Sequence, residues 1–218
     1  MSVKSLFREL VDSNETDISM TDKQISIISA AIEIFAEKGY AATSTSEIAK
    51  KAGVGEGTIF HHYKTKKDLL LAVPEYLNML SFSKAFPDNI SKIFEKPYEN
   101  FEDFLIDVIR NRKRFIEKNM MFIKVLFQEI PFHPELRTKI SQSILIPATD
   151  KLSKVLDRYK EKGQIIDIPN ASIVNLMFSS VFGYFFTNYI IGFGLKVDSE
   201  KETEYLIQYI MNGVGKNS

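Results

Sequence analysis

The chain has 218 residues, enough for one large domain or for a small domain joined to a larger one. Its 44% hydrophobic and 26% charged residues are typical of a folded soluble protein. The absence of cysteine excludes disulfides, thiolate metal sites and cysteine nucleophiles. The 28 basic and 28 acidic residues cancel, so any surface that attracts nucleic acid must be local.

Residues 1–20 are polar and contain neither a long apolar segment nor the cleavage-site pattern of an export signal. We expect a flexible leader here, with at most a short amphipathic turn around Leu6, Phe7 and Leu10. The missing export signal and the missing cysteines are both compatible with a cytoplasmic protein.

The first firm helix begins at residue 21. Thr21 and Gln24 form a capping box, in which each side chain accepts a hydrogen bond from the other residue's backbone N–H. Gly39 predicts the end of this helix. Its apolar residues recur at helical spacing and are Ile25, Ile28, Ile32 and Phe35.

Two short helices follow. A second capping box at residues 44–47 begins a helix that ends at Gly53, and another short helix covers residues 57–63. Ile59 and Tyr63 are four residues apart, so we expect them to pack inward together. Two short helices joined by a glycine turn form a helix-turn-helix, whose second helix can enter the major groove of DNA.

The rest of the chain has the periodicity of long helices, and no segment alternates as a strand does. A fourth helix begins at the cap formed by residues 65–68. Pro74 falls inside it, where its missing N–H and its ring predict a kink or a break. The sequence therefore predicts an all-α protein. The later helices are expected at about 99–118, 120–130, 135–162, 171–193 and 199–213.

Positive charge is concentrated in residues 42–67. This segment contains Lys50, Lys51, Lys64, Lys66 and Lys67 but only two acids, Glu47 and Glu56. A local excess of lysine is what contact with DNA phosphates requires.

Many residues of the N-terminal part stand in a characteristic order, which runs Ala30-Ala31, Phe35, Gly39-Tyr40, Thr43, Thr45, Ile48-Ala49, Ala52-Gly53-Val54, Gly57-Thr58-Ile59-Phe60-His61-His62-Tyr63-Lys64, Lys66 and Leu69-Leu70. This pattern closely resembles the DNA-binding signature of the tetracycline-repressor (TetR) family and covers residues 21–80. The resemblance implies a three-helix DNA-binding domain over 21–68, followed by a larger helical domain over 69–218 for effector binding and dimerisation.

The resemblance also assigns roles to residues of the helix-turn-helix. Thr45 and Lys66 correspond to phosphate contacts, and Gly55 and Gly57 to positions where the backbone approaches the duplex. The recognition face comprises Thr58, Phe60, His61 and His62. Without the motif, the two histidines would be interpreted as solvated surface residues; with it, DNA contact is favoured.

Two residues depart from the family pattern. Phe60 stands where the family often has a tyrosine that donates to phosphate, and Glu56 stands where lysine is common. Both changes predict weaker and more selective DNA binding.

The segment Ala171–Leu195 has no charged residue in 25 positions. Its length would allow a membrane span, but its polar residues and the helix-turn-helix favour a helix buried between its own domain and a second copy of the chain. The resemblance places the last two long helices in a four-helix bundle across the dimer axis. The expected dimer residues are Ser179, Gly183, Leu206 and Ile210.

The C-terminal half is rich in phenylalanine, which for any one residue indicates core and collectively suits an apolar or aromatic effector. The candidate pocket residues are Phe104, Phe122, Gln128, Asn175, Phe178 and Phe182.

Together these features predict a homodimeric regulator, with a repressor favoured, that binds a near-palindromic double-stranded operator and is released by a small effector. Pro74 is the candidate hinge. We expect no enzyme activity, cofactor or metal, because no nucleophile–base pair, ligand spacing or phosphate loop is present. The alternatives are a membrane-anchored or partner-binding protein that uses residues 171–195, and a regulator that senses a protein or nothing.

Overall fold

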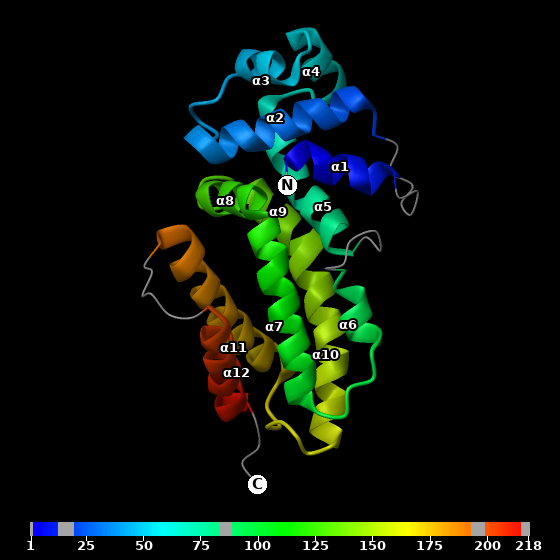
Figure 1. Cartoon of the computed structure of the whole chain (residues 1–218), viewed down its shortest axis with the longest axis vertical. Helices are drawn as coiled ribbons and strands as arrows, with labels where there is room; N and C mark the ends of the chain where they lie inside the picture. The colour runs from blue at the N-terminus through cyan, green and yellow to red at the C-terminus, as the bar shows by residue number, and fades with distance from the viewer. Residues whose placement is uncertain (1, 13–19, 83–88, 193–198, 215–218) are drawn as a thin grey trace. The chain divides into compact units, whose positions relative to one another are not determined.

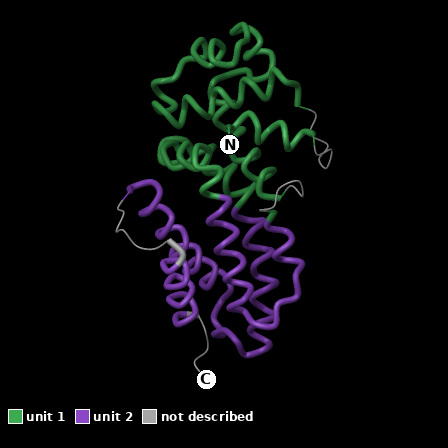
Figure 2. Tube along the Cα trace, viewed as in Figure 1, with its two compact units in different colours: residues 1–89, 116–144 green, residues 90–115, 145–218 purple. Residues whose placement is uncertain are grey.

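The computed structural model describes residues 2–12, 20–82, 89–192 and 199–214. Every element among these residues is a helix, which confirms the all-α prediction (Figure 1). The chain forms two compact units: residues 1–89 with 116–144, and residues 90–115 with 145–218 (Figure 2).

Unit 1 contains the predicted helix-turn-helix, the other helices of residues 1–89, and the helices of residues 116–144. In Figure 1, α3 and α4 lie over α2 at one edge of this unit. Its helices are α1 (Val3–Asp12), α2 (Asp22–Lys38), α3 (Thr45–Ala52), α4 (Glu56–His62), α5 (Lys66–Phe82), α8 (Met120–Glu129) and α9 (Pro134–Ile140).

Helix α2 is the central element of unit 1, because nearly all of its apolar side chains are buried. The capping box of Thr21 and Gln24 forms as predicted, and Gly39 ends the helix with a φ of 84°. Helix α2 contacts α1, α3, α5 and α8, so it joins the helix-turn-helix to the remainder of the unit.

Helix α1 replaces the mobile leader expected over part of residues 1–20. It is strongly amphipathic, and its four apolar residues Val3, Leu6, Phe7 and Leu10 are buried against unit 1. The segment is polar in composition, because only these four residues form the apolar stripe of the helix. Residues 13–19 lie outside the described part.

Unit 2 has an aromatic and aliphatic core between α7 and the last helices. It contains α6 (Ser91–Glu95), most of α7 (Phe101–Lys118), α10 (Ile146–Glu161), α11 (Asn170–Phe185), the π-helix η2 (Phe186–Ile191) and α12 (Ser199–Val214). A second π-helix, η1 (Ser141–Leu145), interrupts the single helix expected over 135–162. The core therefore depends on residues far apart in sequence, from Tyr98 to Ile210.

Candidate functional site

The helix-turn-helix begins at Ser44, whose side chain accepts a hydrogen bond from the Glu47 backbone N–H, while Glu47 accepts from the Ser44 N–H at 2.9 Å. Lys38 also bonds the Glu47 carboxylate. These hydrogen bonds lower the pKa of Glu47 to about 2, with Lys38 making the largest contribution. Gly53, in the left-handed conformation at φ 72°, then ends α3 as predicted.

At the start of α4, two exposed glycines, Gly55 and Gly57, leave the backbone uncovered by side chains. Gly55 has an ordinary φ of −71°, and Gly57 is not among the described glycines with positive φ. A Cβ atom added at either position would meet nothing within 4 Å. Neither glycine is thus required by the fold itself, which is the pattern expected where an external molecule approaches the backbone closely.

Thr58, His61 and His62 lie on one side of α4, and Phe60 is not part of that side. Ile59 is fully buried beneath them, whereas Phe60 is 47% exposed. Gly57, Thr58, His61 and His62 line a groove of about 720 Å³. Its opposite wall is Thr21, Asp22 and Lys23 at the start of α2. The four predicted residues of this wall are therefore brought together by the fold.

Thr45 and Glu56 are joined directly. The Thr45 hydroxyl donates to Glu56 Oε1 at 2.5 Å, which links the first residue of α3 to the first residue of α4. The hydroxyl proton predicted for a phosphate oxygen is used within the protein.

Lys66 is more deeply involved in the fold than its predicted phosphate contact implies. Its ammonium group donates to the carbonyls of Tyr40 at 2.8 Å and Thr43 at 2.7 Å, and lies 4.2 Å from the centroid of the Tyr40 ring. Two of its three donors are thus occupied, so a phosphate contact by Lys66 remains a prediction for the third.

The other lysines of the basic segment divide into two groups. Lys51 pairs with Glu33 at 3.0 Å and Lys67 with Glu135 at 2.5 Å, so their charges are partly neutralised within unit 1. Lys50 and Lys64 are exposed. The local positive charge available to a partner is therefore smaller than the sequence indicates.

A contact that the sequence did not predict connects α8 to the turn before α3. Glu129, only 8% exposed, accepts from the Tyr40 backbone N–H at 3.1 Å and pairs with His133 at 3.3 Å. The Tyr40 and His133 rings meet edge to face, with centroids 5.0 Å apart. The available sequence signal was an acid at the end of a largely apolar helical segment.

An aromatic series also connects α8, α1, α5 and α4. Phe7 lies between Phe122, at 5.9 Å, and Tyr76, at 4.8 Å between centroids, and the Tyr76 and Tyr63 hydroxyls are 2.9 Å apart. Burial raises the pKa of both tyrosines, so they remain neutral hydrogen-bonding groups. Tyr63 is the residue that ends α4, so the series reaches the recognition helix.

The structure does not gather the six predicted pocket residues into one cavity. Phe122 belongs to the unit 1 core, and Gln128 is exposed on the same helix. Phe104 packs with Tyr98, Phe101 and Tyr159 in the core of unit 2.

The remaining three pocket residues share the exposed face of α11. Phe178 and Phe182 stack with centroids 5.5 Å apart and are 52% and 39% exposed, and Asn175 is exposed beside them. Aromatic content predicted a shared pocket, but the helical registers of these residues direct them to different surroundings.

The predicted dimer residues also separate into two sets. Ser179 is exposed and Gly183 half-buried on the same face of α11 as the stacked phenylalanines. Leu206 and Ile210, by contrast, are 9% and 5% exposed within the unit 2 core. The expectation that these two face a partner is therefore corrected, since the outward face of α12 carries Tyr205 and Tyr209 instead.

Helix Asn170–Ile191 is, among the described residues, long and apolar enough to cross a membrane, with a mean hydropathy of 1.2. Only 17% of its most apolar window is buried. Length and composition are the features of this helix that are compatible with a membrane span.

Pro74, the candidate hinge, is buried within α5, which continues through it from Lys66 to Phe82 without a break. Of the kink or break expected there, the break is absent, and the proline still leaves one carbonyl of the preceding turn without its helical donor.

Comparisons with known proteins agree with this architecture. Residues 27–73 match the family model described as bacterial regulatory proteins, tetR family. The first curated relative, the HTH-type transcriptional regulator YerO of Bacillus subtilis, is 42% identical over 30% of this chain, but the match spans only 22% of that protein. The regulator YvkB of Bacillus subtilis is 28% identical over 86% of this chain and 95% of its own length.

Solved structures share the fold along most of the chain. The fatty acid degradation regulator FadR of Bacillus halodurans superposes with a TM-score of 0.74 at 24% identity, covering 90% of this chain and 98% of that one. The FadR regulator of Bacillus subtilis, in complex with stearoyl-CoA, has a TM-score of 0.72 at 23% identity and covers 87% and 98%. The N-terminal helix-turn-helix of this chain thus matches the model of the tetR family of bacterial regulatory proteins, and the chain shares its all-helical fold with solved regulators.

Proposed function

We propose that the protein is a homodimeric repressor that binds a near-palindromic operator through α4. The observation that carries the proposal is the start of α4, where two glycines that the fold does not require flank an exposed acid beside the recognition face. Two such helices would enter successive major grooves ~34–36 Å apart.

The direct test is a shift assay on the DNA upstream of the protein's own gene, at several salt concentrations. The logarithm of the affinity is expected to fall linearly with the logarithm of the salt concentration, and His62→Ala should weaken binding. Specific binding that is absent at every salt concentration contradicts the proposal. Lys50→Ala is the comparison variant, because loss of a phosphate contact should weaken binding to all DNA sequences equally.

The dimer is supported by the outward surface of α11 and α12. On α11, Leu176 is 62% exposed, and the stacked phenylalanines are exposed as well; on α12, Tyr205 and Tyr209 are 56% and 71% exposed. Apolar side chains of this size are seldom left in solvent together unless a partner covers them. A second copy of the same face would complete a four-helix bundle.

The repressor role and the effector complete the proposal. We infer an apolar effector that binds among the aromatic residues of unit 2, because Tyr98, Phe101, Phe104 and Tyr159 form a continuous ring cluster there. The relative in complex with stearoyl-CoA makes a long acyl-CoA the first probe. Stearoyl-CoA should release the protein from DNA, whereas coenzyme A alone should not; release by neither excludes this class.

Pro74 remains the proposed hinge of the response. Replacing Pro74 by Ala restores the missing helical N–H and should stiffen α5. The variant is expected to bind DNA but to need more effector for release. An unchanged effector dose–response curve contradicts the hinge. Repression itself is measured by a reporter fused to the upstream DNA, which should be silenced by the protein; activation of the reporter contradicts the repressor role.

A further inference from the structure

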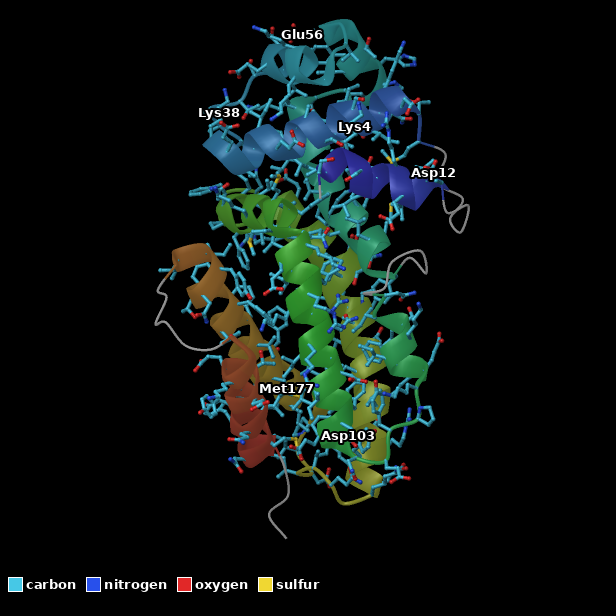
Figure 3. The ribbon with its side chains drawn as sticks, in the orientation of Figure 1. Lys4, Asp12, Lys38, Glu56, Asp103 and Met177 are labelled. Atoms are coloured by element: carbon cyan, nitrogen blue, oxygen red, sulfur yellow. The ribbon has the colours of Figure 1, made fainter. Side chains whose placement is uncertain are left out.

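Glu56 is an acid at the first position of the helix proposed to read DNA. Its neighbours Gly55 and Gly57 have no side chains, and the space around both is open. Glu56 is exposed, and Figure 3 shows it at the edge of unit 1 formed by α3 and α4. It is thus the one side chain of residues 55–57 that can extend toward a partner of this surface.

The carboxylate is held in place by a neighbouring helix. Thr45, at the first position of α3, donates its hydroxyl proton to Glu56 Oε1. A hydrogen bond to an ionised acceptor is shorter and stronger than a neutral one. Thr45 therefore fixes the direction of Glu56 across the helix-turn-helix.

An ionised carboxylate accepts hydrogen bonds and donates none. After the bond from Thr45, most of its acceptor sites remain available. DNA phosphates offer no donors and repel the charge. The groups of the major groove that can donate are the exocyclic amino groups, N4 of cytosine and N6 of adenine, and carboxylates pair with cytosine N4.

We propose that Glu56 is a specificity-determining residue, which accepts a hydrogen bond from an exocyclic amino group of one operator base, and that Thr45 is its positioning residue. The inference rests on the proposed binding of operator DNA by α4. It assigns to Thr45 a role different from the phosphate contact implied by the family resemblance, because its hydroxyl proton is already used.

The competing interpretation is that Glu56 acts only by repulsion. An acid that merely repels phosphate lowers affinity for all sequences by the same factor and leaves the preferred bases unchanged. A base-reading acid changes the preference at one position of each half-site. The two interpretations therefore predict different base preferences, and a change in protein stability would not alter the preferred base.

The experiment is selection of bound sequences from a random pool of double-stranded DNA by the full-length protein and its variants, followed by affinity measurements on the selected site. The variants are Glu56→Gln, Glu56→Ala and Thr45→Val, the last of which keeps the branched shape and removes the hydroxyl. Glu102→Gln is the matched control, because Glu102 is also an exposed acid in the first turn of a helix but lies on α7 in unit 2.

The wild type and the control are expected to select cytosine or adenine at one position per half-site and to lose ~10-fold or more in affinity when that base is changed. Selection of cytosine identifies N4 as the donor, and selection of adenine identifies N6. Glu56→Ala should abolish this preference, Glu56→Gln should weaken it or turn cytosine to adenine, and Thr45→Val should reduce it in part.

Higher affinity of Glu56→Ala for every sequence, with base preferences identical to the wild type, would overturn the inference alone. A wild-type protein that selects no sequence from the pool would overturn the proposed function, and this inference with it.

Discussion

The outward faces of α4 and α11 expose different kinds of chemical group. The α4 face has the bare backbone of Gly55 and Gly57, an acid that Thr45 holds, and two imidazoles. The α11 face has large apolar side chains that the chain leaves in solvent. The first surface suits a polar partner approached closely, and the second suits a partner that removes apolar area from water.

The regions behind these faces also differ. Unit 1 holds its reading helices by specific polar contacts, such as Glu129 to Tyr40 and Lys66 to two carbonyls. Unit 2 is held mainly by a ring-rich core that includes Phe104 and Tyr159. Polar contacts fix a geometry, whereas an apolar core tolerates repacking around a ligand.

The largest expected effect concerns the packing of α1 against the other helices of unit 1. Phe7 is fully buried between Tyr76 and Phe122, so Phe7→Ala should lower the free energy of unfolding by about 3–5 kcal/mol. The measurement is urea unfolding followed by circular dichroism. Phe60→Ala, which truncates a ring 47% exposed, is the control and should change stability by less than about 0.5 kcal/mol. Equal losses in the two variants contradict the described packing of α1.

The next effect tests the apolar face of α11. Leu176→Glu places a charge on the exposed surface of α11 and should weaken a dimer by about 2 kcal/mol or more, which light scattering detects as a monomer. The control is Met121→Glu, which alters a side chain 47% exposed on α8 in unit 1 and should stay dimeric. A wild-type monomer, or a Leu176→Glu protein as dimeric as the wild type, contradicts the assignment of this face.

A smaller effect concerns the contact between α8 and the turn before α3. Glu129→Ala leaves the Tyr40 N–H without its acceptor and should cost about 1–3 kcal/mol. Hydrogen exchange should show faster exchange at Tyr40 than in the wild type. Gln128→Ala, at the neighbouring exposed position, should leave that exchange unchanged. Unaltered protection of Tyr40 in Glu129→Ala indicates that another group holds the turn.

The smallest effect is the pH dependence of the α3 cap. Hydrogen bonds from Lys38 and Ser44 lower the pKa of Glu47 to about 2 from 4.5, so the folded state favours its ionised form. The resulting stabilisation is fully present above the unfolded pKa and is lost as the pH falls toward 2. The melting temperature of wild type minus that of Glu47→Gln should thus be positive at pH 7 and shrink below pH ~4.5. A difference independent of pH excludes this cause.

The local features of unit 1 could be predicted from sequence, because capping boxes, glycine stops and four-residue spacings are set by neighbours in the chain. The capping box of Ser44 with Glu47 and the end of α3 at Gly53 occur as predicted, and Ile59 is buried while Tyr63 is half-buried. The family resemblance indicated which residues of α4 are expected to contact DNA.

The features that depend on tertiary contacts could not be predicted. The stripe of α1 becomes informative only beside α2, and the carbonyls bound by Lys66 belong to a loop whose path its own sequence does not determine. Leu206 and Ile210 satisfied the pattern of an apolar helix face, but that pattern cannot distinguish the chain's own core from a dimer surface.

The most direct test of the α4 interface is Gly57→Ala. The added Cβ meets no atom of the chain within 4 Å and replaces a helical glycine, so the melting temperature should stay the same or rise. If DNA approaches this backbone closely, the same methyl group should lower affinity for the upstream DNA by ~10-fold or more, as loss of one good contact does. A stable Gly57→Ala protein that binds DNA as tightly as the wild type would contradict the account.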